Sequence, residues 1–314
     1  MGKMMHKILG ISIIAAGLAL FLYPDIKTFL LDQKTGQAIE EFEEAYGNDY
    51  AGDLNQGTDT ECSADDSVNR GSESLLAEVS RYNTEIYENG QEDFKDAWAV
   101  TQVPVVLDGL EDSLFGYIEI PAMEVRLPLY VGATSSNMAK GAVVLGETSL
   151  PVGRENTNSV IAGHRGYQGA PYFRDIEKLN PGDEIIVTNP WGTLYYQVES
   201  AAVILPDDSN AVRIQEGRDM VTLLTCHPYR SHGKYRYVVY CVRTDGPNAV
   251  SNDESGSERD AGWIAPLDGI SFHSSADDIR MEQLLRKCGA MLILVMAGFT
   301  AFKKLMRKKN NDEW

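Results

Sequence analysis

The sequence predicts a mostly β protein, an antiparallel β-barrel with a few short helices. Between residues 115 and 243, short apolar segments rich in Val, Ile and Tyr alternate with turns that contain Gly, Pro or Asn. Two of these turns, at Asn180-Pro-Gly-Asp and Asn189-Pro-Trp-Gly, are firm signals because Pro and Gly favour turn conformations. A closed barrel suits many short strands, since closure leaves no strand edge exposed.

Eight segments of this region have the length and composition of β-strands. Each is rich in β-branched or aromatic residues and is bounded by turn residues. In chain order they are FGYIEIP (115–121), VRLPLYVG (125–132), AVVLG (142–146), SVIAGH (159–164), DEIIVTN (183–189), LYYQVESAAVIL (194–205), VTLLTC (221–226) and RYVVYCVR (236–243). Within this region, helix is expected only over residues 135–140 and 172–179.

The stretch before the barrel is predicted to be a helical and linker extension. Residues 40–44 continue a helical pattern, and residues 47–74 are rich in Gly, Asp, Asn and Ser, which is typical of a linker. Apolar residues at positions 75, 76, 79, 82 and 86 have near-helical spacing, so an amphipathic helix is expected over residues 75–89. Residues 245–260 are again polar and predict a second linker.

Two uncharged apolar runs lie near the ends of the chain, at residues 8–23 and 288–302. Both are shorter than the roughly 20 residues that cross a bilayer, but flanking Lys and Arg side chains can extend their reach. The first run follows a basic leader and has no small-x-small cleavage site, which favours an uncleaved anchor. The second run could be a buried helix, but its basic tail from Lys303 to Lys309 is hard to place beside a core.

Basic residues at both ends predict how the chain is oriented in a membrane. The positive-inside rule places both termini in the cytoplasm and everything between them outside, so the protein is expected in the cell membrane with an extracellular central domain. The predicted boundaries are residues 1–24 for the N-terminal membrane anchor, 25–113 for the helical and linker extension, 114–244 for the β-barrel domain, 245–283 for the polar linker and 284–314 for the C-terminal transmembrane segment and basic tail.

The charge distribution excludes some classes of function. The 314-residue chain has a formal net charge of -18, and many of its basic residues lie near the termini, so the centre is strongly acidic. This argues against nucleic acid as a partner. GxGxxG, GxxxxGK[ST] and GxSxG are all absent, and no cofactor is expected. The four cysteines, Cys62, Cys226, Cys241 and Cys288, lack paired spacing, so no disulfide framework is expected.

Three residues at predicted strand ends form a candidate catalytic group. Cys226 ends the apolar strand 221–226, and His164 follows another strand between two glycines that permit close approach. Arg236 opens the strand after Cys226, so antiparallel pairing of these two strands would bring Arg236 level with Cys226. Taken singly, a free cysteine is most often a small buried hydrophobe, a lone histidine a surface residue and an arginine a solvated charge. Their joint position is what indicates chemistry.

Other residues near Cys226 offer alternatives. His227 follows Cys226 directly, so its side chain should point to the opposite face if the strand continues. His232 lies in the next loop and could line a groove. A zinc site of Cys226, His227 and His232 has no second cysteine pair to support it, and no metal is expected. Cys241 alternates out of phase with Arg236 along its strand and is interpreted as structural.

The joint pattern resembles the sortase family over about half the chain. The resemblance is carried by GYIEIP, LPVGRENTNSVIAGHRG and LLTCHPY, with an Arg opening the next strand. It implies the eight-stranded sortase-type β-barrel, with His164, Cys226 and Arg236 in the places of the family's catalytic residues. It further implies that Cys226 attacks the Thr carbonyl of an LPxTG-like sorting signal, and that an amine then resolves the acyl-enzyme.

Within that family, three features resemble the pilin-polymerising class C enzymes. These are the long N-terminal extension, the second predicted span and the string Asp96-Ala97-Trp98. In class C, an Asp and an aromatic residue form a lid over the catalytic cleft, and Asp96 and Trp98 fit those roles. Ala97 departs from the usual proline, which would have stiffened the backbone. His227 also replaces the Thr of that class. The alternative is a surface loop whose Trp98 packs on the barrel.

The resemblance leaves more than one function open. A class C enzyme would join sorting-signal proteins, here pilins, to a lysine amine of the next pilin. A sortase that anchors surface proteins to the peptidoglycan precursor would use the same acyl-enzyme. A non-catalytic, membrane-tethered assembly or adhesion domain is an alternative from another class. A papain-like hydrolase fits less well, because its Cys should precede its His and open a helix.

Overall fold

The computed structural model describes residues 23, 26–46, 66–92, 94, 113–166, 170–231, 233–246, 264–265, 274–291 and 293. They belong to two compact units, Met1–Phe272 and His273–Trp314. Among the described residues, every strand belongs to the first unit.

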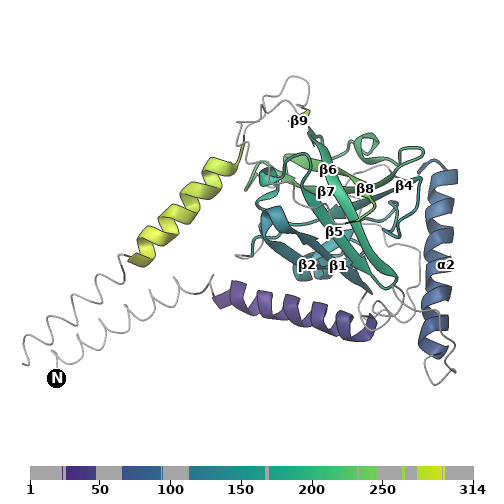
Figure 1. The fold of residues 1–314 in the computed structure, drawn as a ribbon. Helices are drawn as coiled ribbons and strands as arrows, with labels where there is room; N and C mark the ends of the chain where they lie inside the picture. The colour runs from purple at the N-terminus through teal and green to yellow at the C-terminus, as the bar shows by residue number, and fades with distance from the viewer. Residues whose placement is uncertain are drawn as a thin grey trace, which may run out of the picture. The chain divides into compact units, whose positions relative to one another are not determined.

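Eight strands of the first unit close into a barrel (Figure 1). They are β1 (Leu114–Ile120), β2 (Val125–Val131), β3 (Ala142–Val144), β4 (Thr157–Ala162), β5 (Glu184–Asn189), β6 (Gly192–Ile204), β7 (Asp219–His227) and β8 (Tyr235–Thr244). Their order is β5-β1-β2-β3-β4-β7-β8-β6, and β5 pairs with β6 to complete the ring. The eight predicted strand segments and the predicted barrel are thereby confirmed.

The pairing is mostly antiparallel, with two exceptions. β2 runs parallel to β3, and β4 runs parallel to β7. A further strand, β9 (Ile264–Ala265), pairs in parallel with β6 at residues that the sequence assigned to the polar linker 245–283. A two-residue strand is too short to produce a periodic signal, so the sequence does not predict β9.

Alternation along the strands produces two apolar clusters, one on each side of the sheet. On β8, Tyr237, Val239 and Cys241 belong to the larger cluster, whereas Val238 belongs to the smaller one. Cys241 is fully buried, and this burial raises the pKa of its thiol. The structural interpretation of Cys241 is confirmed, because its sulfur lies in the core.

The short helices agree with the sequence at one place and differ at another. α3 (Ser135–Lys140) has the predicted bounds, and the Thr134 hydroxyl caps it by accepting a hydrogen bond from Asn137 N at 3.1 Å. The expected helix over residues 172–179 is wrong: turns lead into a single 3₁₀ turn, η3 (Ile176–Lys178). Pro181 follows closely and disfavours helical backbone before it. Two further 3₁₀ turns are η2 (Pro121–Met123) and η4 (Asn210–Val212).

The amphipathic helix before the barrel is α2 (Asp66–Glu88), and it is longer than predicted. Its apolar residues Leu75, Val79, Tyr82 and Ile86 are buried in the larger cluster, as their spacing indicated. Residues 66–74 are mostly polar and carry no helical periodicity, so the sequence predicts that they belong to the linker 47–74. That assignment is wrong from residue 66 onward, and residues 47–65 lie outside the described ranges.

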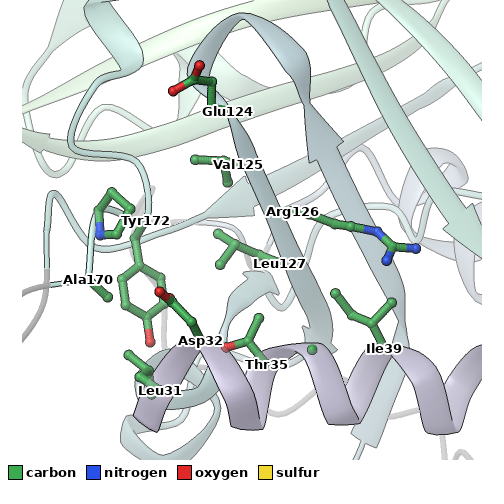
Figure 2. A pocket seen from close by; sticks show the side chains of 12 residues that line it. Leu31, Asp32, Thr35, Ile39, Glu124, Val125, Arg126, Leu127, Ala170 and Tyr172 are labelled. Carbon is green, nitrogen blue, oxygen red and sulfur yellow. The ribbon is translucent and has the colours of Figure 1, made fainter. Parts of the chain in front are cut away.

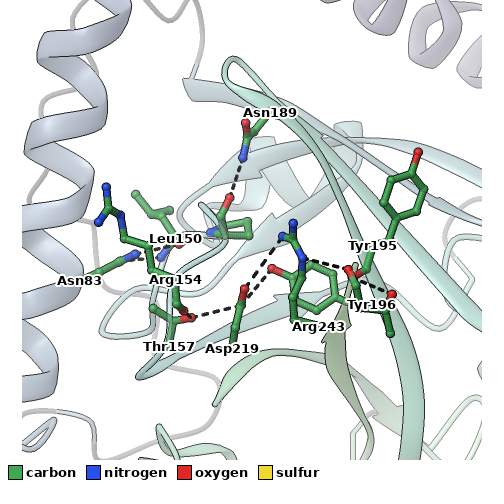
Figure 3. Close-up of polar contacts among 11 residues, drawn as sticks. Asn83, Leu150, Arg154, Thr157, Asn189, Tyr195, Tyr196, Asp219 and Arg243 are labelled. Atoms are coloured by element: carbon green, nitrogen blue, oxygen red, sulfur yellow. Dashed lines mark hydrogen bonds and ion pairs between the residues drawn. The ribbon is translucent and has the colours of Figure 1, made fainter. Parts of the chain in front are cut away.

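Asn83 fixes α2 to the barrel domain. Its side-chain amide donates to Leu150 O at 2.9 Å, and its carbonyl oxygen accepts from Leu150 N at 2.8 Å (Figure 3). Both backbone groups of Leu150 are buried, so they need these partners. A polar residue on the apolar face of α2 thus sets the helix in register with the barrel.

A second helix, over residues 26–46, packs on the outside of β1 and β2. Phe42 meets Tyr117 edge-on at 6.1 Å, and Arg126 Nη2 pairs with Glu43 Oε1 at 2.5 Å. Nearer the start of this helix, Leu31 and Asp32 face Leu127 across a cavity of about 300 Å³ (Figure 2). Tyr172 also lines this cavity.

The second unit is described from its helix over residues 276–291, which the Ser274 hydroxyl caps by accepting from Ala276 N at 3.2 Å. Cys288 lies on this helix and is exposed. Among the described residues, none of the helices is both long and apolar enough to cross a bilayer. The runs 8–23 and 288–302 lie mainly outside those residues, so the two spans, the cytoplasmic termini and the membrane location stay predictions.

Candidate active site

The candidate site is built on three neighbouring strands, β4, β7 and β8. Ala162, the last residue of β4, pairs with Leu224 of β7, and the next amide, Gly163 N, donates to Leu224 O at 3.1 Å. The Thr225 hydroxyl donates to Gly163 O at 2.7 Å. Continuing this parallel register by two residues beyond the Ala162–Leu224 pair brings His164 level with Cys226.

The partner of Cys226 on the other side is the predicted one. In the antiparallel pair of β7 and β8, Cys226 lies directly opposite Arg236. The pairing expected from the sequence is therefore confirmed. Cys226 occupies the middle strand, with His164 on one side and Arg236 on the other.

Gly233 marks where the sulfur and the guanidinium converge. A Cβ built on Gly233 would lie 3.2 Å from Cys226 Sγ and 2.7 Å from Arg236 Nη1. Gly233 also has a φ of +80°, a conformation that glycine adopts without steric cost. Both the positive φ and the lack of room for a Cβ at this point favour a glycine.

Arg236 is buried and held by the loop that precedes it. Its Nη1 donates to Gly233 O at 2.7 Å and to Tyr235 O at 3.2 Å. These bonds fix the direction of the guanidinium plane beside Cys226. An arginine placed in this way can donate to an oxyanion that forms on a carbonyl bound at the sulfur.

His164 is half-buried and held by the segment that follows it. The ring of Tyr172 meets its imidazole edge-on at 6.1 Å and 89°, and Phe173 N donates to His164 O at 3.0 Å. Burial lowers the pKa of the imidazole from its ordinary value of 6.5. The neutral form, which can accept a proton, therefore prevails at pH 7.

The glycine before His164 has a different use from the expected one. A Cβ on Gly163 would lie 2.8 Å from the ring of Phe173, so the missing side chain accommodates that ring. The expectation that Gly163 allows a substrate or another strand to approach is corrected accordingly. Gly166 has a φ of +81° and serves the turn after His164.

His227 points away from Cys226, as its place in the strand predicted. Its side chain is buried and contacts Arg165 and Glu177 on the interior face of the sheet. A zinc site shared by Cys226 and His227 is not supported, since the two side chains lie on opposite faces, and His232 is outside the described ranges. Within those ranges, no three His, Cys, Asp or Glu side chains are grouped as a metal ion would need.

The predicted lid residues Asp96 and Trp98 lie outside the described residues. Phe94, two positions earlier, is described and fully buried. It belongs to the smaller apolar cluster, together with Leu224 and Val238. These two residues are two positions from Cys226 and Arg236 along their strands, so Phe94 packs on the face of the sheet that carries the candidate site.

Several residues of the site were not found from the sequence. Gly233, Tyr172 and Arg165 contact the three candidate residues or their backbone, and Glu177 contacts Arg165 and His227 behind them. Arg165 and Gly233 gave a weak signal, because each lies within three residues of a candidate. Glu177 gave none, since only the folded loop brings it to β7.

Comparisons with known proteins agree with this architecture. The sortase domain family matches residues 118–244. The chain is similar to Clostridium perfringens sortase C in its structure with the C-terminal cell wall sorting motif, with 30% identity and a TM-score of 0.53 over 67% of this chain and 100% of that one. It is also similar to Streptococcus agalactiae sortase C1, with 32% identity and a TM-score of 0.53 over 57% of this chain and 92% of that one.

A curated relative matches over a shorter length. Sortase D of Bacillus subtilis is 27% identical over 130 residues, which are 41% of this chain and 63% of sortase D. The chain belongs to the sortase family of transpeptidases, and its structural neighbours are class C sortases.

Replacing Gly233 with Ala is expected to crowd Cys226 and Arg236. The added methyl group would lie too close to the Arg236 guanidinium and against the Cys226 sulfur, so one of them must move. We expect labelling of Cys226 by a thiol reagent, followed by peptide mass spectrometry, to slow about tenfold, the effect of about 1.4 kcal/mol on the barrier.

Gly217→Ala is the matched control for backbone strain. Gly217 has a φ of +72°, close to that of Gly233, but a Cβ at this position would meet nothing within 4 Å. This variant should lose some stability and label at the normal rate. Equal labelling rates in the two variants would contradict the crowding at Gly233.

Proposed function

We propose that the protein is a membrane-anchored cysteine transpeptidase that cleaves an LPxTG-like sorting signal after Thr and transfers the acyl group to an amine. One observation carries the proposal: Cys226 and Arg236 are direct partners across β7 and β8, and His164 follows β4 at the same level. A nucleophile, an acid–base group and an oxyanion donor are the parts that acyl transfer needs.

In the first half-reaction, the Cys226 thiolate attacks the Thr carbonyl carbon. A bond forms between sulfur and carbon while the Thr–Gly peptide bond breaks, and a proton from His164 goes to the leaving amine. Arg236 donates to the carbonyl oxygen as its negative charge develops. The fixed direction of the Arg236 guanidinium supports this role, because Gly233 O and Tyr235 O hold it.

In the second half-reaction, an amine replaces the thiol. The incoming nitrogen attacks the thioester, the bond between carbon and sulfur breaks, and His164 takes the proton that the amine loses. Burial lowers the pKa of His164, which supports its role as base at this step. The first step needs the protonated form of His164, and the same burial makes this form the minor one near pH 7.

The acceptor that we propose is a lysine amine of a pilin. Support comes from similarity to a pilus-related sortase C of Group B Streptococcus, which is 28% identical over 56% of this chain with a TM-score of 0.51. The alternative acceptor is the peptidoglycan precursor. Both acceptors resolve the same acyl-enzyme, so Cys226, His164 and Arg236 do not separate them. A non-catalytic assembly domain is the alternative that would tolerate loss of Cys226.

We also propose that both termini are cytoplasmic and that the barrel lies outside the cell membrane. The basic residues beside the runs 8–23 and 288–302 motivate this topology. A reporter fused after Trp314 should be cytoplasmic, and an external reporter would rule out the second span.

Cys226→Ala should abolish acyl-enzyme formation on an LPxTG peptide while leaving the barrel folded. The reason is that Ala removes the nucleophile and leaves β7 intact. Mass spectrometry of the protein after incubation with the peptide measures the adduct, and circular dichroism measures the fold. Cys241→Ala is the control, because Cys241 lies in the core on the next strand and should leave the adduct unchanged. An adduct on the Cys226→Ala protein would show that Cys226 is not the nucleophile.

The same assay separates the acceptors when both are supplied to the wild-type protein. A product with an isopeptide bond between Thr and the Lys of a pilin supports polymerisation. A product joined only to the peptidoglycan amine would overturn it in favour of wall anchoring.

Trp98→Ala tests the proposed lid. Phe94 supports a lid, since it packs on the face of the sheet that carries Cys226, four residues before Trp98. If Trp98 shields the sulfur, its loss should speed labelling of Cys226 about tenfold by raising the population of the open state. Trp191→Ala is the control, because Trp191 packs on Phe115 at the β5–β6 turn. An unchanged labelling rate in Trp98→Ala would mean that residues 96–98 do not cover Cys226.

A further inference from the structure

We propose that Arg165, Glu177 and His227 form a buried positioning cluster that fixes the backbone of Cys226 relative to His164. The cluster lies on the interior face of the sheet, on the side away from the sulfur. The inference rests on the proposed function, because it takes Cys226 as the nucleophile and His164 as the acid–base group. None of the three residues touches the reacting atoms, so they are positioning residues.

Arg165 connects the ends of the two strands. It follows His164 directly, and its Nη1 donates to the carbonyl oxygen of Cys226 at 3.4 Å. The same nitrogen lies 3.2 Å from Nδ1 of His227, which can accept when its proton is on Nε2. One guanidinium therefore contacts the backbone of the proposed nucleophile and the side chain next to it.

Glu177 supplies the charge that keeps this arginine buried. Arg165 Nη2 pairs with Glu177 Oε1, and the two side chains are only 3% and 8% exposed. The same carboxylate oxygen lies 3.5 Å from His227 Nδ1. A buried guanidinium without a counter-charge would be strongly unfavourable, so Arg165 and Glu177 depend on each other.

The carboxylate arrives on the segment that also holds His164. Glu177 belongs to η3, a few residues after Tyr172 and Phe173, which contact the ring and the carbonyl group of His164. This segment is therefore fixed to His164 at one end and to Arg165 and His227 at the other. Movement of His164 relative to β7 would have to break the buried contacts of Arg165 with Cys226 O and of Arg165 and Glu177 with His227.

The ends of β7 and β8 and the segment that follows β4 contribute to the cluster in the same way. Arg165, His227 and Tyr237 are the next residues after His164, Cys226 and Arg236. The Tyr237 ring lies 5.7 Å from Arg165 Cζ, and its centroid lies 5.7 Å from that of His227. Side chains alternate between the faces of a sheet, so packing on the inner face fixes the relative positions of the three candidates on the outer face.

Glu177→Gln and Arg165→Lys test the cluster in the full chain. Glu177→Gln removes the counter-charge of Arg165. Arg165→Lys keeps a positive charge for Glu177, but a single ammonium lacks the fork that reaches Cys226 O and Glu177 together. Arg165→Lys should also fold if Glu177→Gln does not, because its ion pair survives.

Asp219→Asn is the matched control at the opposite end of β7. The Asp219 side chain is 9% exposed and lies 3.9 Å from Arg243 Nη1, and it accepts from the Tyr196 hydroxyl at 3.1 Å (Figure 3). Its replacement removes a carboxylate that is about as buried as that of Glu177 but remote from Cys226, although its partner Arg243 is 33% exposed. It should lower the melting temperature and leave the kinetics unchanged.

Three quantities are measured: the rate of acyl-enzyme formation on an LPxTG peptide, the peptide concentration at half-maximal rate, and the alkylation rate of Cys226. All are measured at a temperature where circular dichroism shows that each variant is folded. We expect the maximal acylation rate of Glu177→Gln and Arg165→Lys to fall at least about tenfold, because small displacements of reacting groups slow the chemical step strongly. The half-maximal peptide concentration should stay within about twofold, since the peptide-binding face is untouched.

Wild-type acylation and alkylation rates in folded Glu177→Gln and Arg165→Lys would overturn the cluster, and so would an equal loss of rate in Asp219→Asn. If the wild-type protein itself forms no acyl-enzyme, the proposed function fails. The alkylation rates still decide the cluster in that case, because they report the setting of Cys226 without any substrate.

Discussion

The register of β4, β7 and β8 is the constraint on which the candidate site depends. Leu224, two residues before Cys226, pairs with Val238 of β8, and this register places Cys226 opposite Arg236. Leu224 also pairs with Ala162 of β4 on its other side. A shift of β7 by one residue would turn Cys226 toward the core and bring its neighbour to the surface. Backbone pairing along the whole strand therefore determines which side chain meets a substrate.

That alternation gives each strand end two different tasks. The outer side chains His164, Cys226 and Arg236 have the chemistry for acyl transfer, and the inner ones that follow them in sequence fill the buried space behind. An ion pair in that space is unusual, because burial penalises charge unless it is matched. Arg165 is matched by Glu177, so the polar groups can stabilise one arrangement of the strand ends.

The barrel could be predicted because its strands leave a periodic signal and its turns contain Pro, Gly and Asn. The sequence also predicted that Arg236 lies opposite Cys226, because two adjacent antiparallel strands joined by a short loop have few possible registers. The roles expected of His164 and Cys226 in acyl transfer came from the resemblance of the motifs around them to the sortase family.

Other features of the site could not be read in this way. Glu177 comes from a 3₁₀ turn that a long loop places beside β7, and no local pattern reveals such a contact. The need for Gly233 depends on the space between two side chains, which appears only after folding. β9 and the first turns of α2 lack apolar periodicity, so local sequence gave no reason to expect them.

The central claim is that His164 lies beside Cys226 at the end of the β4–β7 pair, and cross-linking tests it most directly. Neighbouring strands lie about 4.8 Å apart, within the range that a disulfide bridges. In a protein whose other cysteines are replaced by Ser, His164→Cys should form a disulfide with Cys226 on mild oxidation, seen as the loss of two hydrogens by mass spectrometry. Arg165→Cys should stay reduced, since its side chain lies on the other face. A disulfide in Arg165→Cys, with none in His164→Cys, would contradict the register.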